Sequence, residues 1–130
     1  MPKTAEALLS AVEGDAAAQT NLGATPATRF YPSRLPQKPV LPAATYQRIG
    51  GAPVGSYDGL NPLDNGVYQI DVYAETSVAA WDAARAVRDA VDRAASLGAV
   101  FLGIADGFEP EPDPRLHRVT IDVSLWHVES

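Results

Sequence analysis

A segment close to the C-terminus constrains the fold most, because its apolar and polar side chains alternate with the period of a β-strand. One face of this segment, HRVTIDVSLWHV at residues 117–128, carries Val119, Ile121, Val123 and Leu125. The other face carries Thr120, Asp122, Ser124 and Trp126. A strand of this length needs neighbouring strands for its backbone groups and a layer that covers its apolar face. We therefore expect a sheet that is covered on one side.

Length and composition predict one folded domain that spans residues 1–130, because 130 residues with 46% hydrophobic content suffice for one sizeable core. No stretch approaches the roughly 18 apolar residues of a membrane span, and the first residues lack the apolar run of a secretory signal. The chain has no cysteine, which excludes disulfides, thiolate nucleophiles and sulfur-ligated metals. The net charge of -6 opposes tight binding to a phosphate backbone, so DNA is expected to slide past such a surface.

The N-terminal third is expected to contain one helical element and an extended arm. Thr4 is suited to cap a first helix, whose apolar residues recur at helical spacing, and Gly14 weakens this helix before a second short turn at residues 15–22. Residues 23–42 then form a Pro-rich arm, because prolines remove amide donors and hold the backbone extended. This pattern predicts an arm without regular structure that is pinned to the domain by Phe30, Tyr31 and Leu35.

Two strands are expected in the middle of the chain, at residues 43–49 and 66–75. Between them lies GGAPVGSYDGLNPLDN, residues 50–65, which is rich in Gly, Pro, Asn and Asp and predicts a long loop. Loops of more than about 12 to 15 residues inside a compact domain are usually functional. The loop is therefore the strongest positional indication of an interaction site, although a hairpin tip without a role is the alternative interpretation.

The main helix is expected to begin after a cap at Thr76 or Ser77, to run to about residue 97 and to end at Gly98. Its buried stripe consists of Ala80, Ala84, Val87, Val91 and Ala94. The alanines in this stripe allow the helix to lie close to a sheet. A third strand follows at residues 99–105, and its alternation predicts buried side chains at Val100, Leu102 and Ile104.

These elements together predict an α+β fold with the order α-β-β-α-β-β. The simplest arrangement is a mostly antiparallel four-stranded sheet with two helical elements packed on one face.

No group of residues in the sequence indicates catalytic or metal chemistry. His117 and His127 lie ten residues apart on one strand, which is roughly 33 Å at the rise of a strand, so they do not share a metal. Asp71 and Glu75 are also too far apart, at about 13 Å, to share a proton. The acids of residues 106–113 fit no calcium loop, and the glycines lack the ending of a phosphate-binding loop. We therefore predict no enzyme, no cofactor and no metal site.

The uncovered face of the sheet has the composition of a protein interface. Trp126 and Tyr73 are expected on this face, together with Phe101 and Val67, among Thr and Ser side chains and few lysines. Aromatic anchors of this kind supply most of the binding energy in protein interfaces, within a polar rim. The alternative is the ordinary exposure of a few aromatic side chains on a monomer.

Four stretches in succession resemble a known family over nearly the whole chain: RFYPSRLPQ, LPAATYQRIGG, VYQIDVYAE and VTIDVSLWHVE. The succession resembles the tail terminator, or tail completion, proteins of long-tailed (siphovirus-type) phages and gene transfer particles, which include the lambda-type terminator. The resemblance implies an α/β subunit that forms a homo-oligomeric ring, typically a hexamer, on the head-proximal end of the tail tube. Such a ring ends tube polymerisation and joins the tail to the head.

The implied partners are copies of the chain itself, the major tail tube protein and a head-neck connector or stopper protein. DNA passes through the bore without specific binding, and no membrane and no cofactor are implied. The implied location is the virion, assembled in the host cytoplasm.

Within this resemblance, we expect contacts between subunits or with partners at three places. The candidates are Val54, Tyr57 and Leu60 on the long loop, Tyr73 and Trp126 on the uncovered face, and Arg34 and Arg48 as charge partners across the ring. A neck or head-completion protein at the same junction remains an alternative. A small-ligand-binding α+β domain is another, and it would require an apolar pocket.

Overall fold

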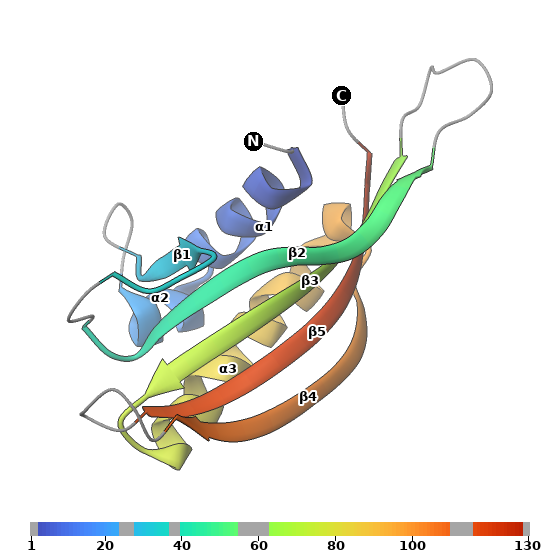
Figure 1. Ribbon diagram of the computed structural model, residues 1–130. Helices are drawn as coiled ribbons and strands as arrows, with labels where there is room; N and C mark the ends of the chain where they lie inside the picture. The colour runs from blue at the N-terminus through green and yellow to red at the C-terminus, as the bar shows by residue number, and fades with distance from the viewer. Residues whose placement is uncertain (1–2, 24–27, 37–39, 55–62, 110–115, 129–130) are drawn as a thin grey trace.

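The computed structural model describes residues 3–23, 28–36, 40–54, 63–109 and 116–128, which form a curved sheet with helices on one face (Figure 1). The elements are α1 (Lys3–Glu13), α2 (Ala16–Leu22), β1 (Phe30–Pro32), β2 (Ala43–Val54), β3 (Leu63–Ala74), α3 (Ser77–Arg93), the 3-10 turn η1 (Ala95–Leu97), β4 (Val100–Glu109) and β5 (Leu116–Val128). The predicted α+β class is confirmed. The N-terminal helical element consists of two helices, and α2 coincides with the second short turn predicted at residues 15–22.

The sheet has five strands in the order β1-β2-β3-β5-β4, and β1 runs parallel to β2 while the other pairs are antiparallel. The prediction of four strands was wrong because β1 forms inside the Pro-rich arm. Phe30 is buried and stacks on Tyr46 with ring centroids 4.5 Å apart, and the Ala44 amide donates to the Arg29 carbonyl. The free energy gained by burying Phe30 against Tyr46 outweighs the preference of the prolines for an extended, solvated backbone. Burial also raises the pKa of the Tyr46 hydroxyl.

The hairpin of β2 and β3 is longer than the sequence predicted. The ladder continues to the pair Val54 and Leu63, so both ends of the predicted loop at residues 50–65 are strand. Gly51 permits this extension: its φ is +95°, and a Cβ there would lie 1.9 Å from the Asn65 carbonyl oxygen. At this end of the sheet β5 reaches as far as β3, because Leu63 pairs with Val128 (Figure 1).

The core lies between the helices and one face of the sheet, as the alternation predicted. Val119, Ile121, Val123 and Leu125 are all buried there, as are Ala80, Ala84, Val87 and Val91 of the predicted stripe. The helix ends at Arg93, earlier than predicted, so Ala94 follows it and is only partly buried. Thr76 caps α3 by accepting from the Ala79 amide at 3.1 Å, and Gly98 has a left-handed φ of 51° after η1. Thr4, in contrast, is no cap: it lies inside α1, and its hydroxyl donates to Asp64.

The burial predicted for the third strand was wrong. Val100, Leu102 and Ile104 are 53%, 58% and 37% exposed, because β4 is the outer strand and the helices leave it largely uncovered. A bulge between Phe101 and Gly103 also breaks the alternation. Phe101 pairs with Val123 and packs against the core, so its predicted place on the uncovered face was wrong as well.

Candidate interaction surface

The open face, defined here as the sheet face opposite the helices, is polar and preorganised. At its centre the Thr120 hydroxyl donates to Asp71 Oδ1 at 2.6 Å, and Gln69 Nε2 donates to Asp71 Oδ2 at 3.0 Å. Asp71 is buried by its neighbours even though no described element covers this face. The carboxylate is therefore held in place by bonds within the sheet before any partner arrives.

The two aromatic residues predicted on the open face lie at its opposite ends. Trp126 is 42% exposed and pairs with Asn65, whereas Tyr73 is half-buried and pairs with Arg118. Eight residues of β5 separate these two positions, which is about 26 Å at the rise of a strand. Tyr73 and Trp126 therefore belong to two contact regions and not to one aromatic patch.

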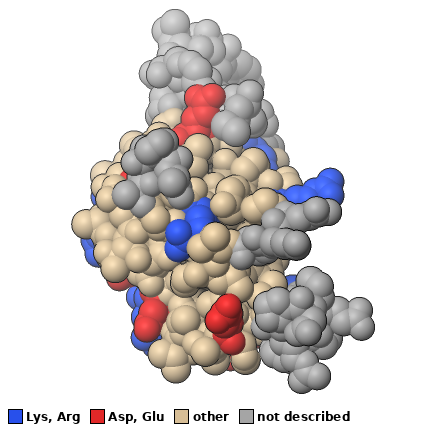
Figure 2. Space-filling model, turned by 90° about the vertical axis from the view of Figure 1, so that its left-hand side faces the viewer, with Lys and Arg blue, Asp and Glu red and all other residues tan. Residues whose placement is uncertain are grey.

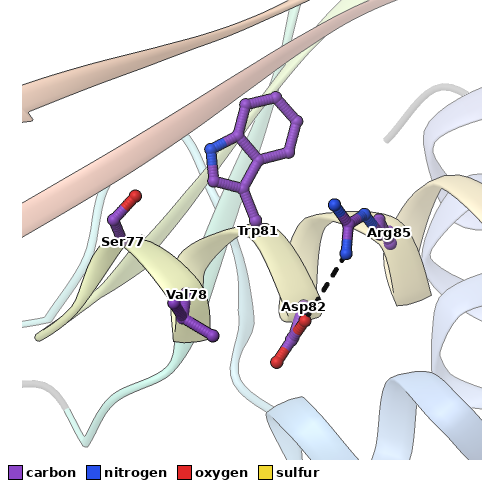
Figure 3. A pocket seen from close by; sticks show the side chains of 5 residues that line it. All are labelled: Ser77, Val78, Trp81, Asp82 and Arg85. Carbon is purple, nitrogen blue, oxygen red and sulfur yellow. Dashed lines mark ion pairs between the residues drawn. The ribbon is translucent and has the colours of Figure 1, made fainter.

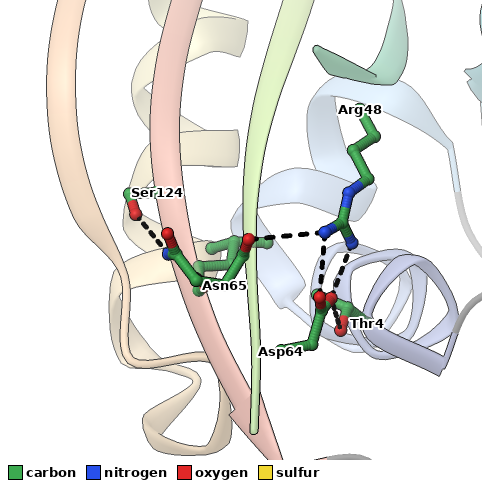
Figure 4. Close-up of polar contacts among 6 residues, drawn as sticks. Thr4, Arg48, Asp64, Asn65 and Ser124 are labelled. Carbon is green, nitrogen blue, oxygen red and sulfur yellow. Dashed lines mark hydrogen bonds and ion pairs between the residues drawn. The ribbon is translucent and has the colours of Figure 1, made fainter. Parts of the chain in front are cut away.

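Arg48 and Asp64 form an ion pair on the helix-covered side of the β2–β3 hairpin (Figure 4). The two guanidinium nitrogens donate to the two carboxylate oxygens at 2.6 and 2.8 Å, and the Thr4 hydroxyl donates to Oδ2 at 2.7 Å. These bonds hold the pKa of Asp64 below its usual value, with the Arg48 bond as the main cause, and they raise the pKa of Arg48. Arg48 thus has its charge partner within the subunit.

The base of the hairpin is also fixed on the open face. Asn65 Nδ2 donates to Ser124 Oγ at 2.8 Å and to the Leu125 carbonyl at 3.2 Å. Figure 4 shows that Asn65 and Asp64 point to opposite sides of β3, toward β5 and toward α1. The start of β3 is therefore anchored to two different neighbours, β5 and α1.

The remaining predicted contact residues lie at the hairpin and beside β1. Val54 is the last residue of β2, and Tyr57 and Leu60 lie outside the described residues. Arg34 is exposed in the turn that follows β1, where Ser33 has a φ of 68° and the Arg34 amide donates to the Pro32 carbonyl at 2.8 Å.

Exposed apolar side chains gather at the two edges of the sheet, a feature that the sequence analysis missed. Among the described residues, four of the seven exposed large hydrophobic side chains are Ile49 on β2 and Val100, Leu102 and Ile104 on β4. The alternation of the three β4 residues resembles that of a core strand, which is why the sequence predicts them as buried. The glycine at position 103 inside the pattern was the available signal, because glycine within a strand often marks a bulge.

A hollow lies beside the first turns of α3, lined by Ser77, Val78, Trp81, Asp82 and Arg85 (Figure 3). The Arg85 guanidinium lies 6.0 Å from the Trp81 ring centroid and 3.7 Å from Asp82 Oδ1. Val78 is 71% exposed, so the hollow is open to solvent. Its acid and base already face each other, and this arrangement does not resemble the enclosed apolar pocket that a small ligand requires.

Titratable groups do not converge in the part of the chain that the structure describes. His117 and His127 lie near opposite ends of β5, and no three described His, Cys, Asp or Glu residues gather as metal ligands. Figure 2 shows charged residues scattered over the face that it presents, without a continuous basic patch. None of the described helices has the length and hydrophobicity needed to cross a membrane.

Comparisons with known proteins point to one family. The family model described as "Tail completion protein gp17" matches residues 6–128. A search of curated proteins finds no match. A chain of the solved structure titled "Virion of native gene transfer agent (GTA) particle" superposes with a TM-score of 0.57 at 15% identity, over 95% of this chain and 93% of that one. This likeness supports the fold over nearly its whole length.

Proposed function

This chain belongs to the family of tail completion protein gp17, and on that premise we propose that it forms a homo-oligomeric ring on the head-proximal end of a phage-type tail tube. Membership makes it a structural protein of the virion tail. In the proposed role the ring ends polymerisation of the tube and joins the tail to the head. The family match carries this proposal, because it spans all the described strands, from β1 to β5.

Ending a polymer requires a subunit with two unlike ends. One end complements the last ring of the tube, and the other offers no site for the next tube subunit. We propose six copies in the ring, the major tail tube protein at one end and a head-neck connector protein at the other. The end of the sheet formed by β2, β3 and β5, with Val54 at the end of β2, is well placed to make such a contact because these strands extend past the start of β4, where Val100 pairs with Ser124 (Figure 1).

In this role DNA crosses the ring and must not be held there. The net charge of -6 supports free passage, because an acidic wall repels phosphates and releases no counterions on contact. The scattered charges of Figure 2 also lack the basic stripe that a binding groove for nucleic acid requires.

The structural neighbour comes from a gene transfer particle, which supports a place in either a phage or such a particle. A neck or head-completion protein at the same junction is the alternative, because both roles need a ring and a tail-facing end. No catalytic role is proposed. Besides the hairpin, the proposed contact residues are Arg34, Tyr73 and Trp126, with Tyr57 and Leu60 in the segment between β2 and β3, and Arg48 contributes by fixing the hairpin.

Deletion of the gene tests the proposal. We expect tails of irregular length and heads that remain separate from tails by electron microscopy, with recovery when an intact copy is supplied. Tails of normal length that remain without heads would favour the neck protein. Normal particles from the deletion would overturn both roles.

A further inference from the structure

We propose that neighbouring copies join edge to edge, with β4 of one subunit pairing antiparallel to β2 of the next, so that the sheets run on from subunit to subunit. This inference rests on the proposed ring and names the surfaces that close it. A contact between two different edges is heterologous, and it closes into a ring when successive rotations complete a full turn.

The β4 edge joins a long strand to exposed apolar side chains, and its bulge at Phe101 and its acids Asp106 and Glu109 give it only part of the protection that free edges of monomeric sheets usually carry. β4 is ten residues long, pairs only with β5 and contains no proline, lysine or arginine. It exposes Val100, Leu102 and Ile104. Free edges in soluble proteins are normally short, charged or broken by proline, because unpaired backbone groups beside apolar side chains recruit another strand. The β4 edge therefore has the properties of a surface that is covered in an assembly.

The opposite edge of the sheet offers a matching partner. β1 covers β2 only from Ala44 to Tyr46 and then ends at Pro32, so residues 47–54 of β2 pair on one side only among the described residues. Ile49 lies in this stretch at a bulge and is 50% exposed. A strand added here gains backbone hydrogen bonds and covers an apolar side chain at the same time.

The register across the sheet places the apolar residues of the two edges at the same level. Gly50 aligns with Val67, then with Ser124, and then with Val100 on the far edge. β2 and β4 also run in opposite directions, so a neighbour related by rotation about an axis roughly along the strands presents β2 antiparallel to β4. Ile49 of one copy then lies beside Val100 and Leu102 of the next.

The charges at the two edges are complementary in the same register. Pro32 aligns through Tyr46 with Ile104, and the turn at Ser33 keeps the exposed Arg34 near this level. Asp106, also exposed, lies two residues beyond Ile104, which is about 7 Å along the strand. A flexible arginine side chain spans this distance. At this level the edge of the neighbour is β1, so the contact brings an acid of the β4 edge toward a base beside β1, next to the pairing of β4 with β2.

Cysteine cross-linking tests this contact directly, because the chain contains no cysteine of its own. The pair Ile49→Cys and Leu102→Cys lies on opposite edges of one subunit, separated by three strand spacings of roughly 4.8 Å each, beyond the reach of a disulfide. Under mild oxidation of assembled tails, we expect a ladder of covalent oligomers that ends at the full ring and disappears on reduction.

Two control variants distinguish the alternatives. Leu102→Cys alone should give no cross-link, whereas strong dimers from it would mean that two β4 edges pair with each other and would overturn the proposal. The pair Val78→Cys and Leu102→Cys should also give no ladder, because Val78 is exposed on α3, away from the β2 edge.

Charge reversal gives a second measurement that needs no cross-link. Arg34→Glu and Asp106→Arg should each cause a several-fold loss of rings on tail tubes, and the double variant should recover most of that loss. Intact rings without the cysteine ladder, and without charge rescue, would overturn the edge contact while leaving the proposed function standing. Absence of any ring from the wild-type chain on tail tubes would instead overturn the proposed function.

Discussion

Arg48 and Asp64 face each other across neighbouring strands, and the two N–O distances of their ion pair are 2.6 and 2.8 Å. The Thr4 hydroxyl of α1 donates to the same carboxylate, so one acid joins the first helix to the β2–β3 hairpin. The Asp64 side chain is 4% exposed and that of Arg48 28%. The Asp64 carboxylate is therefore shielded from solvent. Loss of a partner lowers the free energy of unfolding most at such a buried charge.

Replacement of Asp64 by alanine is expected to lower the free energy of unfolding by about 2–4 kcal/mol, because it leaves the Arg48 guanidinium and the Thr4 hydroxyl without their acceptor. Denaturant unfolding measures the effect. Asp82→Ala is the matched control, since Asp82 and Arg85 form an exposed pair on α3. The control should change stability by less than about 0.5 kcal/mol. Equal effects of the two substitutions would contradict the assigned role of Asp64.

The contribution of Asp64 should disappear in acid. Its pKa is lowered in the folded chain, so folding is favoured while the carboxylate is ionised, and that advantage is lost as pH falls through the lowered pKa. The stability difference between the wild type and Asp64→Asn is therefore expected to be constant above about pH 4, the ordinary value for aspartate, and to shrink below it. Unfolding curves over a pH series measure the difference. A gap that widens in acid would show that the sign is wrong.

The small residues of α3 should not tolerate enlargement. Ala84 is fully buried between the helix and the sheet, so Ala84→Leu must push the two layers apart. We expect a loss of about 1–3 kcal/mol in the free energy of unfolding. Arg85→Leu, at the next position and exposed, should change stability by less than about 0.5 kcal/mol. Thermal unfolding of both variants would show whether close packing sets the distance between the layers.

Gly51 should be the glycine on which the hairpin depends. Gly51→Ala places a methyl group against the Asn65 carbonyl at a positive φ, and the expected cost is about 1–3 kcal/mol. Gly103→Ala is the comparison, because a Cβ at Gly103 meets nothing within 4 Å, and its effect should be near zero. Similar unfolding midpoints for the two variants would mean that the strands adjust freely at Gly51.

Trp126 should matter more for assembly than for folding. Trp126→Ala removes a side chain that is 42% exposed, so the subunit should lose only about 1–2 kcal/mol. Binding to tail tubes, measured by co-sedimentation, should fall much more if the open face contacts a neighbour. Val78→Ala, which shortens an exposed side chain on α3, should leave binding unchanged. Full binding by the Trp126 variant would remove this residue from the interface.

Local sequence patterns predicted the centre of the fold, because each pattern indicates side chains that are buried against neighbouring elements. The alternation in β5 identified its covered face, and Thr76 and the alanine stripe identified the start and the buried side of α3. The same reasoning failed at β4, where an apolar alternation marks a sheet edge. Whether a strand is buried depends on its position in the strand order of the sheet, and no local sequence pattern indicates that position.

The contact residues were harder to predict than the fold. Arg48 is predicted as a charge partner across the ring; within the subunit its long side chain reaches Asp64, although the register pairs Arg48 with Tyr68 and Asp64 with Pro53. Tyr73 and Trp126 share the open face as expected, yet they lie at opposite ends of it. Both outcomes depend on which residues face each other across strands, a relationship between distant parts of the chain.

The sequence by itself determined the α+β class, the covered face of the sheet and the resemblance to tail completion proteins. The spacing of apolar side chains and the order of the motifs can both be read directly from the sequence. Only the tertiary structure decided that the Pro-rich arm supplies a strand, that the β2–β3 ladder extends into both ends of the predicted loop, and that β4 is an exposed edge. These features arise from strand order and register, which are set by the packing of segments far apart in the chain.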